Sequence, residues 1–297
     1  MTNDTSEQPS LENLRQLIDA IDAELHEKIV ERIALIDQVA KVKRAMDGNI
    51  HVIRPNREAS MLRVLADRHK GQLQVASVIR IWRELINGAT ALQSPFSVAV
   101  CAPERSVGYW DMARNHFGSS VPMTLHTSPS VVLRMVDDGP GAIGLLPLPQ
   151  NGEKEPWWPA LASQTENQTG PRVIWRLPFF ASPTGQFEQL EALVVAKLTP
   201  EPSGQDVTLM AIETDQDVSQ ARIVEQLGQC DFAPQPLAVQ ELTQTGQRLL
   251  LSELAGFVAA DDRRLQAFRE NLGEDLSRVA ILGVYPKSLA LEIRKPS

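Results

Sequence analysis

The chain has 297 residues, long enough for two or three domains with a sizeable core. Its net charge of −8 argues against nucleic acid or an anionic membrane as the main partner. The two cysteines form no disulfide framework, the histidines are scattered rather than clustered as metal ligands, and the polar start MTNDTSEQPS has no apolar signal core. We therefore expect a cytoplasmic protein without a metal site.

The first predicted element is one uninterrupted helix from Ser10 to Met46, a stretch that contains neither Pro nor Gly. Ser10 is the expected N-cap and Gly48 the expected stop. Apolar residues recur along it at three- and four-residue steps, the period of one helix face. They are Leu11, Leu14, Leu17, Ile18, Ile21, Leu25, Ile29, Ile33, Ile36 and Val39. The helix would be roughly 55 Å long, more than a compact domain of about 90 residues can cover, so its apolar face requires a partner.

Three basic residues along this helix suggest an anion site. Arg32 and Lys43 leave the same face about 16 Å apart, so both side chains can converge on one small anion. Arg15 lies about 25 Å from Arg32 along the axis and roughly 100° around it, so it cannot reach the same ligand from the same helix. A second, antiparallel copy of the helix could bring Arg15 to the Arg32 of the other chain.

Composition marks a boundary at Ser94, because only two of the 20 prolines and three of the 17 glycines precede it. The basic residues are also concentrated in the part of the chain before this boundary. Residues 1–94 hold 13 Lys and Arg against 13 Asp and Glu, whereas the remainder holds 16 against 24. The first 94 residues therefore form the first predicted domain.

Two shorter helices complete this domain. The second is expected from Pro55 to about Lys70, and the third from about Gln74 to Gln93. The third helix should turn one apolar face inward. That face comprises Val78, Ile81, Trp82, Leu85, Ile86 and Ala89. Four arginines are expected on the surface, namely Arg44, Arg63, Arg68 and Arg80.

Residues 95–204 alternate short apolar runs with helical ones, which predicts a small α/β region with mainly parallel connections. GPGAIG at 139–144 formally fits a dinucleotide-binding fingerprint, but it follows a helix and leads into a strand, the reverse of the required order. The region 205–297 reads strand, helix, strand, strand, helix, strand, which predicts a ferredoxin-like βαββαβ domain. The expected fold class is thus multidomain, with an all-α region followed by two α/β regions.

Three stretches give the N-terminal region a family resemblance. The run LENLRQLIDAIDAELHEKIVERIALIDQVAKVK, the stretch RPNREASMLRVL and the closing IWRELINGATALQ resemble the all-helical (type II) chorismate mutases in order and spacing. The resemblance covers nearly all of residues 11–93. It implies an intertwined helical homodimer with shared active sites that isomerises chorismate to prephenate in the pathway to phenylalanine and tyrosine. Because the rearrangement is intramolecular and pericyclic, it implies no cofactor, metal or nucleophile.

The motif match also implies roles for individual residues. Arg15 of one chain and Arg32 of the other would clamp the two substrate carboxylates by bidentate pairing. Lys43 and Gln93 match the residues that donate hydrogen bonds to the breaking ether oxygen. A single charged residue on a long helix is usually solvated, but the joint spacing of this set favours function.

Glu58 matches the acid that holds the ring hydroxyl of the substrate, and Arg57 matches a basic position that lines the pocket. Arg54 is counted with the substrate-binding residues, although an acidic residue is common at its position. Ala89 stands where the family often has a hydroxyl residue near a substrate carboxylate. We expect Ala89 to weaken substrate binding by about 1 kcal/mol rather than to abolish catalysis.

The remainder of the chain resembles part of a second family. VAVCAPE, ARNHFG and AIGLLPLP look like segments of a prephenate dehydratase domain, and AILGVYP looks like the end of the ACT domain in those enzymes. The middle region is too short for both dehydratase lobes. Where that family has its catalytic Thr-Arg-Phe, this chain has Glu191, Ala192 and Leu193. We therefore expect a truncated, non-catalytic dehydratase-like region followed by an ACT-like domain.

Two alternatives to a plain chorismate mutase stay open. The first is a bifunctional chorismate mutase/prephenate dehydratase. The second is a regulatory or scaffolding protein with a vestigial mutase pocket, whose C-terminal region binds a small-molecule effector or a partner enzyme. The intact polar set around Lys43 argues against the second alternative.

Overall fold

The structure is a computed structural model that describes residues 10–47, 53–103, 107–153, 155–164, 170–180, 190–242 and 245–289. The chain divides into two compact units, Met1–Val52 and Ile53–Ser297. The two units meet at Val52 and Ile53 rather than at Ser94. The domain boundary at Ser94 stays a prediction from the sequence. None of the described helices is both long and apolar enough to cross a membrane.

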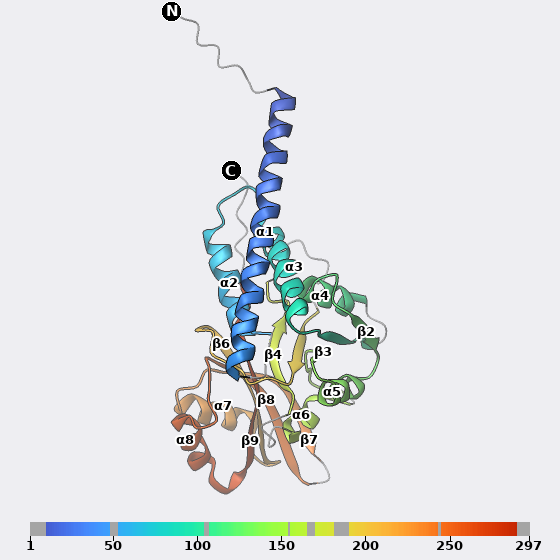
Figure 1. Ribbon diagram of the computed structural model, residues 1–297. Coiled ribbons are helices and arrows are strands. Elements are labelled where there is room, and N and C mark those ends of the chain that lie inside the picture. The colour runs from blue at the N-terminus through green and yellow to red at the C-terminus, as the bar shows by residue number, and fades with distance from the viewer. Residues whose placement is uncertain are drawn as a thin grey trace, which may run out of the picture. The chain divides into compact units, whose positions relative to one another are not determined.

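Helix α1 (Leu11–Asp47) is the described part of the first unit (Figure 1). Its 37 residues form one unbroken helix, as expected for a stretch without Pro or Gly. The Ser10 Oγ accepts a hydrogen bond from the Asn13 N–H at 3.2 Å, which confirms the predicted N-cap. Gly48, the predicted stop, lies outside the described residues. Much of the apolar face is exposed within the chain, with Leu17 at 59% and Leu25 at 56% exposure.

Helices α2 (Pro55–Arg68) and α3 (Val75–Gln93) open the second unit and confirm the two shorter helices predicted. Pro55 starts α2, where its missing N–H costs nothing. Ile81, predicted to face inward, is 49% exposed, whereas Arg83 is only 1% exposed. The prediction was wrong for Ile81, because the buried face of α3 is the one that carries Ile79 and Arg83, and apolar periodicity alone does not place an arginine there.

Arg63 on α2 is also buried, so its predicted place on the surface was wrong. Its guanidinium donates hydrogen bonds to the carbonyls of Gln205 at 3.0 Å and Lys287 at 2.8 Å. It also lies 5.9 Å from the Phe179 ring centroid. Burial is tolerated because these carbonyls and the ring replace water around the cation.

The α/β region that follows alternates strands and helices over residues 95–147, as the alternation of short apolar and helical runs predicted. Its elements are β1 (Ser97–Cys101), α4 (Val107–Phe117), β2 (Met123–His126), α5 (Pro129–Asp138), β3 (Ala142–Pro147), α6 (Trp158–Gln164), β4 (Arg172–Leu177) and β5 (Ala192–Ala196). Strand β1 pairs in parallel with β2 and β3, whereas β5 is antiparallel to both β3 and β4. The region is therefore a mixed sheet rather than the mainly parallel one expected.

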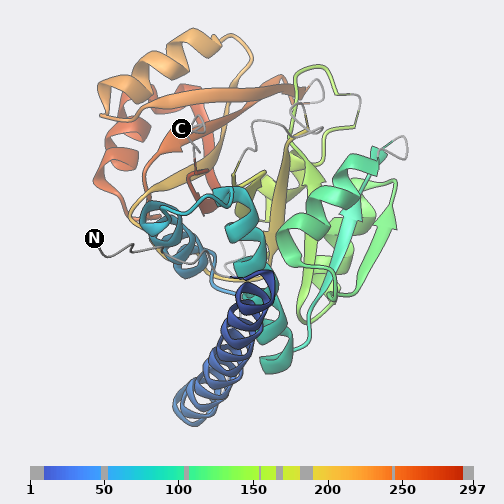
Figure 2. The ribbon, with the colours of Figure 1, turned by 90° about the horizontal axis from the view of Figure 1, so that it is seen from above.

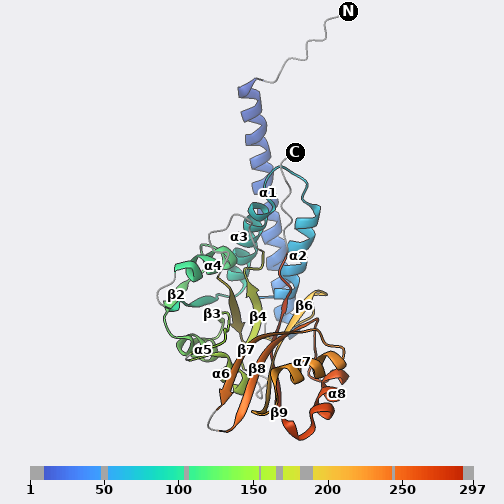
Figure 3. The ribbon, with the colours of Figure 1, turned by 180° about the vertical axis from the view of Figure 1, so that it is seen from behind.

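The C-terminal region has the predicted order of strand, helix, strand, strand, helix, strand. Its elements are β6 (Asp206–Asp215), α7 (Gln220–Gln229), β7 (Pro234–Leu242), β8 (Gln247–Ala255), α8 (Arg263–Leu272), the 3₁₀ turn η2 (Gly273–Asp275) and β9 (Leu276–Pro286). The four strands are antiparallel in the order β9-β6-β8-β7. Helices α7 and α8 lie side by side next to these strands (Figure 3).

One sheet joins the two regions of the second unit. Its strands among the described residues run β2-β1-β3-β5-β4-β9-β6-β8-β7, with Val173 of β4 paired in parallel with Gly283 of β9. A Cβ atom on Gly283 would collide with the Val173 carbonyl oxygen, so this junction requires glycine. Figure 2 shows the green-to-yellow strands of the α/β region beside the orange-to-red strands of the C-terminal region.

Helices α2 and α3 share a hydrophobic core with the α/β region. Leu62 of α2 and Ile79 of α3 belong to the same buried cluster as Val100 of β1, Leu145 of β3 and Trp175 of β4. Helix α4 packs in this cluster too, whereas α5 and α6 contribute to a second cluster that includes residues of β6 and β8. The α2–α3 pair is therefore anchored to the residues that follow it.

Candidate active site

Helix α1 carries three of the predicted site residues, Arg15, Arg32 and Lys43. Because the helix is unbroken, the distances expected from its rise apply, about 25 Å from Arg15 to Arg32 and about 16 Å from Arg32 to Lys43. Arg15 is exposed, and the side chain of Lys43 lies outside the described residues. Within one chain, Arg15 and Arg32 therefore cannot bind the same small molecule.

The start of α2 carries three more predicted residues. Arg54 occupies the N-cap position, and its carbonyl accepts a hydrogen bond from the Glu58 N–H at 2.9 Å. Arg57 is exposed, whereas Glu58 is only 8% exposed. The two neighbouring candidates therefore differ in environment, because successive helix residues point about 100° apart.

The Glu58 carboxylate is paired with a residue that the sequence analysis did not name. Arg83 of α3 donates a hydrogen bond from Nη1 to Glu58 Oε2 at 2.9 Å. Burial raises the pKa of Glu58, while the charge of Arg83 and hydrogen bonds with Arg54 and Arg83 oppose that rise. Burial also lowers the pKa of Arg83 to about 10. No sequence pattern identified Arg83, because it lies beside the apolar face predicted for this helix rather than on it.

Two aromatic rings of the α/β region lie close to the guanidinium of Arg83. Its Cζ lies 4.8 Å from the ring centroid of Trp175 and 5.6 Å from that of Phe179. The His116 ring packs edge-on against Trp175, with centroids 4.9 Å apart. The pKa of His116 lies well below its ordinary value because of burial and the nearby Arg83 charge. The cluster therefore holds one ion pair and a neutral histidine.

Gln93 is the last residue of α3 and is half-buried. Its Nε2 donates a hydrogen bond to the carbonyl of Ala89, one turn earlier, at 3.3 Å. Ala89 itself is buried, so the position where the family often has a hydroxyl contributes only a methyl group here. The amide of Gln93 thus lies at the C-terminal end of α3.

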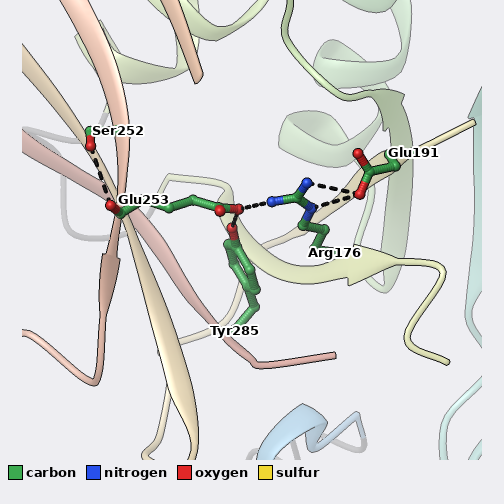
Figure 4. A network of polar contacts seen from close by, with 5 residues as sticks. All are labelled: Arg176, Glu191, Ser252, Glu253 and Tyr285. Carbon is green, nitrogen blue, oxygen red and sulfur yellow. Dashed lines mark hydrogen bonds and ion pairs between the residues drawn. The ribbon is translucent and has the colours of Figure 1, made fainter. Parts of the chain in front are cut away.

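The segment that stands in place of the dehydratase Thr-Arg-Phe lies at the start of β5. Ala192 and Leu193 are fully buried, and Glu191 accepts hydrogen bonds from Arg176 Nε at 3.1 Å and Nη2 at 2.8 Å. Arg176 also pairs with Glu253 of β8, which accepts a hydrogen bond from the Tyr285 hydroxyl (Figure 4).

Glu253 and Tyr285 of this network are buried, whereas the Glu191 side chain is 43% exposed. Although burial works against it, the charges of Glu253 and Glu191 raise the pKa of Arg176 above its ordinary value. Burial and the charge of Glu253 likewise raise the pKa of Tyr285. The network links β4 and the start of β5 to β8 and β9, so Glu191 has a structural contact in this chain.

Comparison with known proteins identifies the helical region. Residues 14–94 match the family described as chorismate mutase type II. They form a type II chorismate mutase domain. The matched residues include most of α1 and all of α2 and α3, and all seven of the predicted site residues lie among them.

Curated relatives of the chain carry two activities in their names. The bifunctional chorismate mutase/prephenate dehydratase of Pseudomonas aeruginosa is 34% identical over 151 residues, which cover 50% of this chain and 41% of that protein. The protein of the same name from Neisseria gonorrhoeae is 31% identical over 124 residues, covering 42% of this chain and 31% of that protein. The chain thus spans less than half the length of the curated relatives that it matches.

Among solved structures, a prephenate dehydratase from Streptococcus mutans is similar to this chain. The superposition covers 66% of this chain and 100% of the dehydratase. The superposition has a TM-score of 0.45 and 11% sequence identity.

Proposed function

We propose that the protein is a chorismate mutase that isomerises chorismate to prephenate in cytoplasmic phenylalanine and tyrosine biosynthesis. The observation that carries this proposal is the match of residues 14–94 to the type II chorismate mutase family, with Arg15, Arg32 and Lys43 on one unbroken helix. The reaction breaks an ether bond within one molecule. The protein must therefore hold a compact substrate conformer and stabilise charge on the ether oxygen.

The proposed site is shared between two chains. Arg15 of one chain and Arg32 of its partner clamp the two carboxylates, because one helix holds these arginines too far apart. Lys43 and Gln93 donate to the ether oxygen, Glu58 accepts from the ring hydroxyl, and Arg57 and Arg54 line the pocket. The exposed apolar residues of α1 support a homodimer, since a second copy would cover them.

The decay of chorismate absorbance after addition of the purified chain tests the proposal directly. We expect the rate to exceed that of the spontaneous rearrangement by several orders of magnitude. A rate equal to the spontaneous one would overturn the enzyme reading and favour a regulatory or scaffolding protein.

A bifunctional mutase/dehydratase is the second candidate, because the curated relatives carry both activities in their names. We propose that this chain lacks the dehydratase activity. Glu191, Ala192 and Leu193 supply neither a hydroxyl nor a guanidinium to assist loss of water and carbon dioxide, and Glu191 is already engaged by Arg176. Phenylpyruvate forming from prephenate above the buffer control would contradict this.

We infer that the chain comprises a mutase domain at 1–94, a truncated dehydratase-like region at 95–204 and a ferredoxin-like, ACT-like domain at 205–297. The order of elements and of strands in β6–β9 supports the last assignment. The helix start Asp217–Ala221 stands where ACT domains usually have a glycine that lets an effector approach the backbone. We therefore expect no tight phenylalanine binding, and calorimetry that measures it would contradict this inference.

A further inference from the structure

The Glu58 carboxylate interacts with the Arg83 side chain and with the backbone at Arg54. Its carboxylate is 8% exposed at the residue level, and Arg83 Nη1 is the side-chain donor that reaches Oε2, at 2.9 Å. A buried carboxylate without a cation is strongly unfavourable, so the charge of Arg83 favours the ionised form of Glu58 against the effect of burial. The carboxylate still has acceptor capacity, because its two oxygens offer about four lone-pair sites and the hydrogen bonds from Arg83 and from the Arg54 backbone do not use them all.

Arg83 in turn depends on the α/β region rather than on the mutase domain. The rings of Trp175 and Phe179 lie against its guanidinium at 4.8 and 5.6 Å, at distances typical of cation–π contacts. Asn87 donates hydrogen bonds to the carbonyls of both Arg83 and His116, at 2.9 Å each, and so ties α3 to α4. The guanidinium of Arg83 thus lies beside two aromatic rings, and the backbone that carries it is tied to α4.

We propose that Arg83 is a positioning residue of the mutase reaction, which holds the Glu58 carboxylate for the ring hydroxyl of chorismate and is itself held by Trp175 of the α/β region. This inference rests on the proposed function and adds a role for the extension. The truncated dehydratase-like region supports one wall of the mutase site. Its role is then mechanical rather than catalytic, and removing it should disable the mutase.

The test is a double-mutant cycle in the full-length chain, with kcat and KM measured for chorismate. Arg83→Gln should lower kcat about as much as Glu58→Gln does, by roughly 100-fold, the size of effect seen when one preorganised polar contact is removed. In the Glu58→Gln background, Arg83→Gln should change kcat less than about 3-fold, because residues that act through one group are not additive. Arg83→Lys, which keeps the charge, should retain most of the kcat that Arg83→Gln loses.

The matched control is Arg80→Gln, an exposed arginine one turn earlier on α3, which should leave kcat unchanged. Near-ultraviolet circular dichroism and the urea midpoint identify variants that fail to fold. If Arg83→Gln fails, the double variant with Glu58→Gln, which buries no unpaired charge, is compared with Glu58→Gln alone.

The outcomes separate the two proposals. A wild-type chain that does not accelerate the rearrangement overturns the proposed function. An active wild type in which folded Arg83→Gln keeps its kcat, or in which the two substitutions multiply, overturns the role of Arg83 and leaves the proposed function standing.

Discussion

Helix α1 and the pair α2–α3 belong to one mutase domain, yet they bury their apolar residues in different ways. On α1, Leu17 and Leu25 are more than half exposed, whereas Leu62 of α2 and Ile79 of α3 are fully buried against the α/β region. The family segment therefore spans both compact units, Met1–Val52 and Ile53–Ser297. Within the second unit, α2–α3 are held by the α/β region, whereas the homodimer proposed above would cover the apolar face of α1.

The largest effect should come from breaking the exposed face of α1. Leu17→Glu combined with Leu25→Glu places two charges eight residues apart on one face, where a dimer would bury them. We expect a monomer by analytical ultracentrifugation and mutase activity indistinguishable from the spontaneous rate. Glu24→Gln, on the same helix, is the control and should stay dimeric and active. A dimeric, active Leu17/Leu25 variant would show that this face is not the interface.

Mixing two inactive variants tests whether each active site is shared between two copies of α1. Arg15→Ala and Lys43→Ala homodimers should each lose about 10²- to 10³-fold in rate, because every pocket then lacks a clamp or a donor. Refolded together, about half of the dimers are mixed and contain one intact pocket, so roughly a quarter of the wild-type rate should return. Subunit exchange without any recovery of activity would contradict the shared-site arrangement.

The buried ion pair of the second unit should contribute more to the free energy of unfolding than an exposed pair on α1. Arg83→Met leaves the buried Glu58 carboxylate uncompensated and should lower the free energy of unfolding by about 3–5 kcal/mol, measured by urea denaturation. Lys28→Met removes the exposed Lys28–Glu31 pair of α1 and should cost less than about 1 kcal/mol. Equal losses would argue that the Glu58–Arg83 pair is solvated.

The smallest effect concerns pH. The pKa of His116 is lower in the folded chain than in the unfolded one, so the unfolded state binds more protons as the pH falls below the unfolded pKa near 6.5. The contribution of His116 to the free energy of unfolding should be fully present above that pH. Below it, the free energy of unfolding should decrease by up to about 1.4 kcal/mol per pH unit. His116→Gln should flatten this slope, and His26→Gln on α1 is the exposed control. An unchanged slope in His116→Gln would contradict the assignment.

Prediction from the sequence succeeded where the information is local. The absence of Pro and Gly, the 3.6-residue period and the Ser10 cap predict α1, because a helix is stabilised by contacts within a few residues. The elements of residues 95–147 and the order of β6 to β9 follow from strand and helix periodicity in the same way. The roles of Arg15, Arg32, Lys43, Gln93 and the α2 residues rest on the family match and stay predictions.

The tertiary structure decided the pairings between distant residues. Glu58 and Arg83 are 25 residues apart, and Arg176 and Glu253 are 77 apart. A charged residue is usually solvated, so Arg63 and Arg83 could be placed inside only once carbonyls, carboxylates and aromatic rings were seen around them. The sequence by itself determined the helices α1 to α3, the elements of residues 95–147 and the order of those from β6 to β9. Packing determined which charges are buried, because burial depends on partners that no local period reveals.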